Sequence, residues 1–172
     1  MQIGEAFVGE GAEAAHINTV LGHRIGPAGT AWATALATPS AGHVPFVAVL
    51  RPGVPVQPMT LFVNKATIAS EAHGHITWGA AQAGVAAGVA DAVADGFVPA
   101  AEVDEYCLIV AVWVDPAATD ADAVYRNNRQ AARDAVVAGA RRTPDLRTVL
   151  DARAEPWNPY FRPSDPAGGA SA

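Results

Sequence analysis

The sequence has little cysteine, little lysine and no long apolar runs. Cys107 is the single cysteine among 172 residues, so neither an intrachain disulfide nor a cysteine zinc cluster can be built. Apolar stretches stay short of the roughly 18 residues that a membrane span needs, and the N-terminus lacks the basic segment and apolar core of a signal peptide. We therefore expect a soluble, cytoplasmic protein with no membrane partner.

Positive charge is scarce as well. Seventeen acidic residues against eleven basic ones give a formal charge of −6 and a pI near 5.2, and the basic residues form no dense run. Nucleic acid is therefore not expected as a partner, because binding to its phosphate backbone needs clustered positive charge. The glycines fit neither the dinucleotide-binding nor the P-loop spacing. The lack of a Gly-x-Ser-x-Gly motif sets serine hydrolases aside.

Apolar residues are plentiful, at 51% of the chain, and can bury the core of one domain. The spacing of apolar residues and the positions of Gly and Pro predict strands over 2–8, 14–21, 45–50, 59–67 and 106–114, and helices over 31–37, 77–94 and 120–140. Because these elements do not alternate regularly, we expect an α/β fold of the α+β two-layer sandwich type. The domain should span 1–161, and the Pro/Gly/Ala/Ser-rich residues 162–172 should form a disordered tail. Cys107 lies in the apolar run 106–114, which favours a core residue over a catalytic thiol.

Lys65 is the only lysine, beside ten arginines. A composition that replaces lysine by arginine wherever either will serve can leave one lysine by chance. It can also keep a lysine whose compact, flexible ammonium a guanidinium cannot imitate. The strand pattern places Lys65 and Thr67 on one face, where both could line one pocket.

Three histidines are candidates for chemistry. His16 shares a face of its predicted strand with Asn18 and is either a hydrogen-bonded core group or a general acid or base. His73 and His75 stand two residues apart, but neighbouring residues supply no carboxylate or cysteine set that would complete a metal site. We therefore expect no metal.

Three separated blocks of the sequence, at 4–11 with 15–17, at 64–68, and at 78–86 with 91–96, resemble the formaldehyde-activating enzyme family, the tetrahydromethanopterin hydro-lyases. Residues 4–11, GEAFVGEG, which run on to AHI at 15–17, look like the N-terminal signature of that family. Residues 64–68, NKATI, are similar to its central Asn-Lys-x-Thr-Ile motif. Residues 78–86, WGAAQAGVA, and 91–96, DAVADG, are similar to its aromatic-Gly-Pro-Ala-Gln-His-Gly-Val-Ala helix and the end of that helix. The blocks occur in the right order and cover roughly residues 3 to 115, which makes the resemblance more specific than any single motif.

The resemblance implies an enzyme that condenses formaldehyde with the reduced pterin tetrahydromethanopterin, giving the methylene derivative and water, with no covalently bound cofactor. It also implies a fold like ribosomal protein S5 domain 2 and a homopentamer with sites between neighbouring subunits. His16 matches the proton donor of the family, which suits a reaction whose carbinolamine loses hydroxide only after protonation. The positions that match pterin contacts are Asn18, Val47, Lys65, Thr67 and Gln82.

The sequence also departs from the family pattern. Asn18 stands where the family has an aspartate, and Ala80 and Ala83 replace a proline and a histidine beside Gln82. These changes leave other functions open: a related enzyme that acts on a different aldehyde or amine, a non-catalytic module that binds a pterin or carbonyl compound, or an oligomeric scaffold. Lys65 could in principle also form a Schiff base with formaldehyde, although a binding role is favoured.

Overall fold

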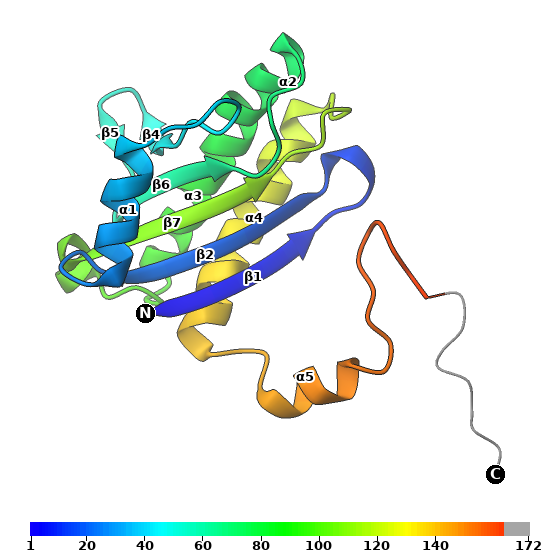
Figure 1. Cartoon of the computed structure of the whole chain (residues 1–172). Coiled ribbons are helices and arrows are strands. Elements are labelled where there is room, and N and C mark those ends of the chain that lie inside the picture. The colour runs from blue at the N-terminus through cyan, green and yellow to red at the C-terminus, as the bar shows by residue number, and fades with distance from the viewer. Residues whose placement is uncertain (164–172) are drawn as a thin grey trace. The chain divides into compact units, whose positions relative to one another are not determined.

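The computed structural model describes residues 1–163, which fall into two compact units divided after Arg142 (Figure 1). The first unit, Met1–Arg142, contains the sheet and the helices packed on it. The second unit begins at Thr143 and contains α5 (Leu146–Ala152). A single domain over 1–161 stays a prediction, and the predicted tail lies outside the described residues from position 164 on.

One mixed sheet organises the first unit. Its strand order is β1-β2-β7-β6-β3, in which β6 and β7 run parallel and the other neighbours run antiparallel. A separate two-stranded ribbon pairs β4 with β5. The strand bounds are β1 Gln2–Val8, β2 Ala15–His23, β3 Phe46–Val47, β4 Val49–Arg51, β5 Val54–Pro55, β6 Met59–Asn64 and β7 Tyr106–Trp113.

Helices form the second layer and confirm the mixed α+β class. The parallel pair β6 and β7 needs a long crossover connection, and the chain between these two strands is largely helical. The helix bounds are α1 Pro27–Ala37, α2 Glu71–His75, a π-helical segment Ile76–Ala81, α3 Gln82–Ala94 and α4 Ala121–Arg141, with 3₁₀ segments at Gly11–Glu13 and Ala100–Glu105. No helix within residues 1–163 is both long and apolar enough to cross a bilayer.

The core lies between the sheet and the pair α3 and α4, which cover one face of it (Figure 1). Strand residues that point to this face are buried, among them Ile17, Phe62 and Val110, and they meet Val85 and Val89 of α3. Burying side chains of this size stabilises the fold by roughly 1.5–3 kcal/mol each. Cys107 is also buried, as predicted, and burial raises the pKa of its thiol.

Within Met1–Arg142, no such layer covers the opposite face of the sheet over β1 and β2. Residues of β2 alternate between buried and half-buried along Ala15–Val20, because side chains alternate across a strand. α1 reaches this second face only near the end of β2, where a side chain on Gly22 would meet Ala28. His16 and Asn18 point to the side of the sheet away from α3 and α4.

Two sequence-based boundaries are wrong. The strand predicted over 59–67 ends at Asn64, because the Asn64 amide donates to the carbonyls of Gly42 and Ala66 and closes a turn there. The helix predicted over 77–94 is already helical from Glu71, where Ser70 caps α2 by accepting from the His73 amide. The strand predicted over 106–114 is present as β7 and is central in the sheet, with one buried and one half-buried face from Leu108 on.

Close packing of α3 against α4 gives a stability prediction. A methyl group on Gly88 would overlap the backbone oxygen of Arg129, whereas one on Gly79 would meet nothing within 4 Å. We expect Gly88→Ala to destabilise the protein by about 1–3 kcal/mol, because the two helices would have to separate. Gly79→Ala, the matched control, should change stability by less than about 1 kcal/mol. Urea unfolding of both variants measures this, and equal stabilities would contradict the packing argument.

Candidate active site

His16 and Lys65 meet at one end of the sheet. Lys65 follows the last residue of β6, and its backbone amide donates to the Val112 carbonyl of β7 at 2.8 Å. Its side chain continues past β7, which lies between β6 and β2, and Nζ donates to the His16 carbonyl at 3.1 Å. The structure therefore brings together the imidazole and the ammonium that the sequence singled out.

Glu5 completes this group from the neighbouring strand. The register of β1 and β2 sets Glu5 opposite Asn18 and Phe7 opposite His16, so Glu5 reaches His16 along the diagonal. Its Oε1 lies 3.0 Å from His16 Nε2, and the two side chains are 59% and 40% exposed. The Phe7 ring stands 6.2 Å from the imidazole, centroid to centroid. We refer to Glu5, His16 and Lys65 as the Glu-His-Lys cluster.

Burial shapes the acid–base properties of this cluster. It lowers the pKa of Lys65 to about 8, against a raising effect of the Glu5 carboxylate. Burial also lowers the pKa of His16 below its ordinary value, the Lys65 charge lowers it further, and Glu5 opposes both. At pH 7 Lys65 is therefore mostly charged, and the lowered pKa of His16 favours the neutral imidazole.

The other predicted site residues do not all lie beside this cluster. Asn18 does, since it shares the face of His16 and stands opposite Glu5. Val47 stands opposite Leu61 on the edge strand β3, which is three strands from β2. At about 4.8 Å per strand, that separates Val47 from His16 by roughly 14 Å across the sheet.

Thr67 and Gln82 contact the segment that carries Val47. The exposed Thr67 hydroxyl lies 3.4 Å from His43 Nε2. Gln82 is buried at the start of α3, and its Oε1 accepts from the Val49 amide at 2.6 Å. Val47, Thr67 and Gln82 thus form a second group around residues 42–49, which we call the loop group.

Sequence analysis missed Glu5 and His43. The predicted pairing of 2–8 with 14–21 was a usable signal for Glu5, because a hairpin register sets which residues share a face with His16. His43 carried no such signal, since its loop has no periodicity. Its Nδ1 bonds the Asn64 carbonyl at 2.9 Å, so the ring is oriented by the end of β6.

His73 and His75 point to different surroundings. His73 is buried, where its Nε2 bonds the Val114 carbonyl at 3.1 Å and its Nδ1 accepts from the Ala69 amide. His75 is largely exposed beside Glu71. Among residues 1–163, no group of three or more His, Cys, Asp or Glu side chains is arranged to hold a metal ion.

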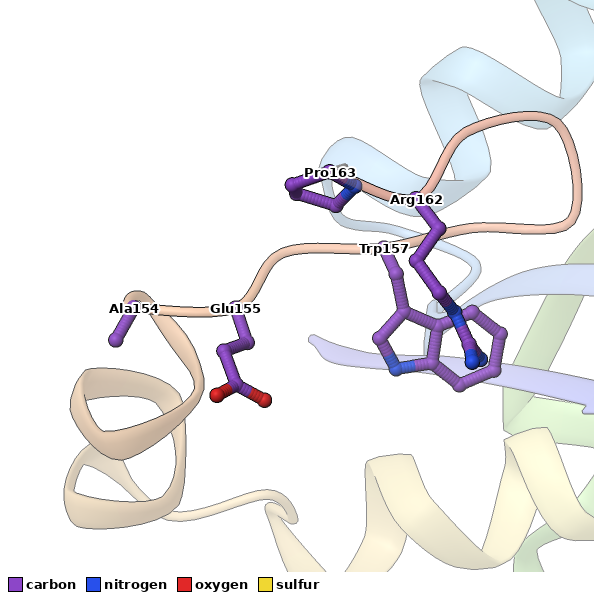
Figure 2. Close-up of a pocket in the computed structure, with 5 residues that line it drawn as sticks. All are labelled: Ala154, Glu155, Trp157, Arg162 and Pro163. Carbon is purple, nitrogen blue, oxygen red and sulfur yellow. The ribbon is translucent and has the colours of Figure 1, made fainter. Parts of the chain in front are cut away.

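A pocket of about 310 Å³ lies within the second unit (Figure 2). It is lined by Ala154, Glu155, Trp157, Arg162 and Pro163, and the Arg162 guanidinium stands 4.9 Å from the Trp157 ring centroid. None of the predicted site residues lines it. Cavity size alone therefore does not point to the chemistry of this chain.

Fold and site together define an α+β protein whose half-open sheet face carries a proton-exchanging cluster. A sequence profile described as formaldehyde-activating enzyme (Fae) matches residues 3–161. The 5,6,7,8-tetrahydromethanopterin hydro-lyase of Methanosarcina barkeri is 38% identical over 158 residues, which cover 92% of this chain and 89% of that protein. The bifunctional enzyme Fae/Hps of Archaeoglobus fulgidus is 39% identical over 159 residues, which cover 92% of this chain and 40% of that protein.

The chain belongs to the formaldehyde-activating enzyme family. It spans about two fifths of the length of the bifunctional relatives that it matches, and most of the length of the single-function hydro-lyase. The family resemblance drawn from the three sequence blocks is thereby confirmed.

The electrostatics of the cluster can be tested directly. Lys65→Met removes the positive charge that lowers the pKa of His16, so the pKa of His16 should rise. NMR titration of the imidazole signals measures this. Arg126→Met, which removes an exposed positive charge on α4, is the matched control and should leave the His16 titration where it is. A His16 pKa that falls or stays fixed in Lys65→Met would show that the ammonium does not act on the ring.

Proposed function

We propose that this protein condenses formaldehyde with a reduced pterin of the tetrahydromethanopterin type, giving the methylene derivative and water, with His16 as the general acid. Membership of the family supports the reaction type. The observation that carries the role of His16 is the Glu-His-Lys cluster, in which the Glu5 carboxylate contacts the imidazole and the Lys65 ammonium donates to the backbone carbonyl of the same residue.

The chemistry requires one proton at a defined moment. A pterin amine adds to the formaldehyde carbon and gives a carbinolamine. His16 donates a proton to the carbinolamine oxygen, water leaves, and the nitrogen lone pair forms an iminium. The second pterin amine attacks the iminium carbon and releases a proton that restores His16. One formaldehyde and two N–H bonds thus become an N–CH₂–N bridge and one water.

Lys65 serves in binding. With a pKa of about 8 it is mostly protonated at neutral pH, so it can donate to a carbonyl or ring nitrogen on the polar edge of a pterin. Thr67, Gln82, Val47 and Asn18 are the remaining proposed contacts. Holding two nitrogens and one carbon in register supplies much of the remaining acceleration.

Asn18 supports a second candidate, a related enzyme that uses another amine acceptor or aldehyde. An amide both donates and accepts hydrogen bonds, whereas a carboxylate only accepts. Asn18 therefore suits an acceptor whose polar edge differs from that of the family substrate. Assays with tetrahydromethanopterin and tetrahydrofolate side by side separate the two candidates by which methylene product forms faster.

We also propose that the chain forms a ring-shaped homopentamer of subunits with the ribosomal protein S5 domain 2 fold. Within one chain Val47 stands on β3, three strands from β2, so a site that joins Val47 to His16 needs the loop group of a neighbouring copy. The exposed side chains of Ile3 and Phe7 on the sheet face of His16 provide apolar surface for such a contact. Cytoplasmic location remains a prediction.

Removal of the proposed acid gives the first functional test. His16→Ala should lower the protein-dependent rate of methylene formation by roughly 10²- to 10⁴-fold, the usual contribution of a positioned acid. His23→Ala is the matched control, because His23 lies at the other end of the same strand, where its ring packs against Tyr106. Stopped-flow measurement with the uncatalysed rate subtracted decides the matter. If His16→Ala still accelerated methylene formation as much as the wild-type protein, His16 could not be the general acid.

The proposal that two neighbouring subunits form each site gives a second test. His16→Ala and Thr67→Trp should each be nearly inactive, the latter because an indole at this exposed position blocks the loop group. In a 1:1 co-assembled mixture, about one quarter of the sites should pair an intact His16 with an intact Thr67 from a neighbour. Recovery of roughly that share of the wild-type rate supports the shared site. No recovery in mixtures that do co-assemble would place both residues in a site within one chain.

A further inference from the structure

Glu5 is the carboxylate that contacts the proposed acid. Within residues 1–163, its Oε1 is the one carboxylate oxygen in ion-pair distance of His16, at 3.0 Å from Nε2. The contact follows from strand register, because Glu5 and His16 are diagonal neighbours on paired strands. Asn18, which stands directly opposite Glu5, carries no charge, so the negative charge on this face beside His16 comes from β1.

The charged and titratable groups that act on His16 are few. Glu5 approaches from β1, and Lys65 approaches from the end of β6. From β7 the residue opposite His16 is Trp113, which carries no charge. α3 and α4 pack on the other face of the sheet. The pKa of the imidazole therefore reflects burial, which lowers it most, the Lys65 ammonium, which lowers it further, and the Glu5 carboxylate, which opposes both.

We propose that Glu5 is a positioning residue that holds His16 by Nε2 and leaves Nδ1 as the nitrogen that gives its proton to the substrate. This inference rests on the proposed function, in which His16 is the acid. Glu5 contacts the imidazole at Nε2. Among residues 1–163 no side chain or backbone group hydrogen-bonds its Nδ1, so Nδ1 is the nitrogen available to a carbinolamine oxygen.

Proton balance agrees with this arrangement. The imidazolium carries one proton on each nitrogen, and the Nε2 proton is donated to Glu5. When Nδ1 gives its proton to the carbinolamine oxygen, that oxygen leaves as water. The neutral ring keeps the proton on Nε2, which stays hydrogen-bonded to the Glu5 carboxylate. The ring then regains a proton at Nδ1 from the second pterin amine. The carboxylate stays ionised throughout, so Glu5 orients the ring and favours its charged form without itself transferring a proton.

Two variants of Glu5 separate charge from shape. Glu5→Gln removes the charge but keeps an oxygen that can accept from Nε2, whereas Glu5→Ala removes both. Glu5 is exposed, so both variants should fold, which circular dichroism checks. Glu71→Gln is the matched control, because it removes a carboxylate beside another histidine, the exposed His75.

The expected result has three parts. Glu5→Gln lowers kcat by roughly two- to fivefold near pH 7, the range that a partly exposed ion pair gives, with little change in the KM for the pterin. The loss of activity at high pH moves to lower pH, because an acid without its carboxylate partner loses its proton sooner. The imidazole titration of His16 moves the same way in NMR. Glu5→Ala lowers kcat at least as far, and Glu71→Gln changes none of the three.

Two results would overturn the proposal. One is an equal loss of rate at every pH with an unmoved His16 titration, which is what a merely structural role would give. The other is a His16 titration that moves to higher pH when Glu5 is neutralised. The NMR titration needs no turnover, so failure of this inference remains distinct from failure of His16→Ala to reduce the rate.

Discussion

The placement of two helices on only one face of the sheet is the constraint on which the rest of this structure depends. α3 and α4 bury one side of β1, β2 and β7, and the small residues along α3 let the two helices lie close together. Every second strand residue then points to the other side. A polar residue there costs little to desolvate, so Glu5, His16 and Asn18 can stand on regular strands without disturbing the core.

The sheet is also a rigid support for acid–base groups. His16 and Glu5 are held in place by backbone pairing of their strands. Lys65 is held by two hydrogen bonds, one from its backbone amide to β7 and one from its ammonium to β2. Partial burial lowers the pKa of both cationic groups, while Glu5 restrains the change. An arginine at position 65 could not take part in this balance, because a guanidinium stays charged at any relevant pH. The single lysine of the chain thus stands where a group that titrates near neutral pH has a use.

The sequence predicted regular elements better than their ends. The strand over 2–8 and the helix over 120–140 follow from alternation and helical spacing, which reflect burial on one side. Asn64 and Ser70 change the predicted boundaries through side-chain bonds to backbone groups nearby. The Asn64 bond to Gly42 depends on where residues 42–49 pass, which no periodicity encodes, whereas the Ser70 cap is a local bond.

The candidate site was predictable to a similar degree. His16 and Lys65 were each singled out from the sequence, and the structure places the Lys65 ammonium on the His16 carbonyl. Glu5 was missed because a charged residue on an exposed strand is expected to face solvent. Its contact with His16 becomes apparent only when the pairing of the two strands is considered. Val47, Thr67 and Gln82 were inferred from a resemblance, and their separation from His16 in one chain depends on how many strands lie between them. The number of strands between them follows from the order of strands in the sheet, which cannot be predicted from the spacing of residues in the sequence.

Asn18 shows why the charge of this face matters more than the shape of any one side chain. A carboxylate at position 18 would stand directly opposite Glu5, and two adjacent negative charges would raise the pKa of each. The same pair would also hold His16 in its charged form to higher pH. With an amide at 18 there is no second carboxylate on this face and His16 keeps a lowered pKa, so fewer rings are charged at neutral pH but each is a stronger acid. A stronger acid suits a carbinolamine oxygen that is hard to protonate, and the amide offers the acceptor amine both a donor and an acceptor. The substitution at 18 therefore changes the acidity of the proposed donor and the recognition of the acceptor at the same time.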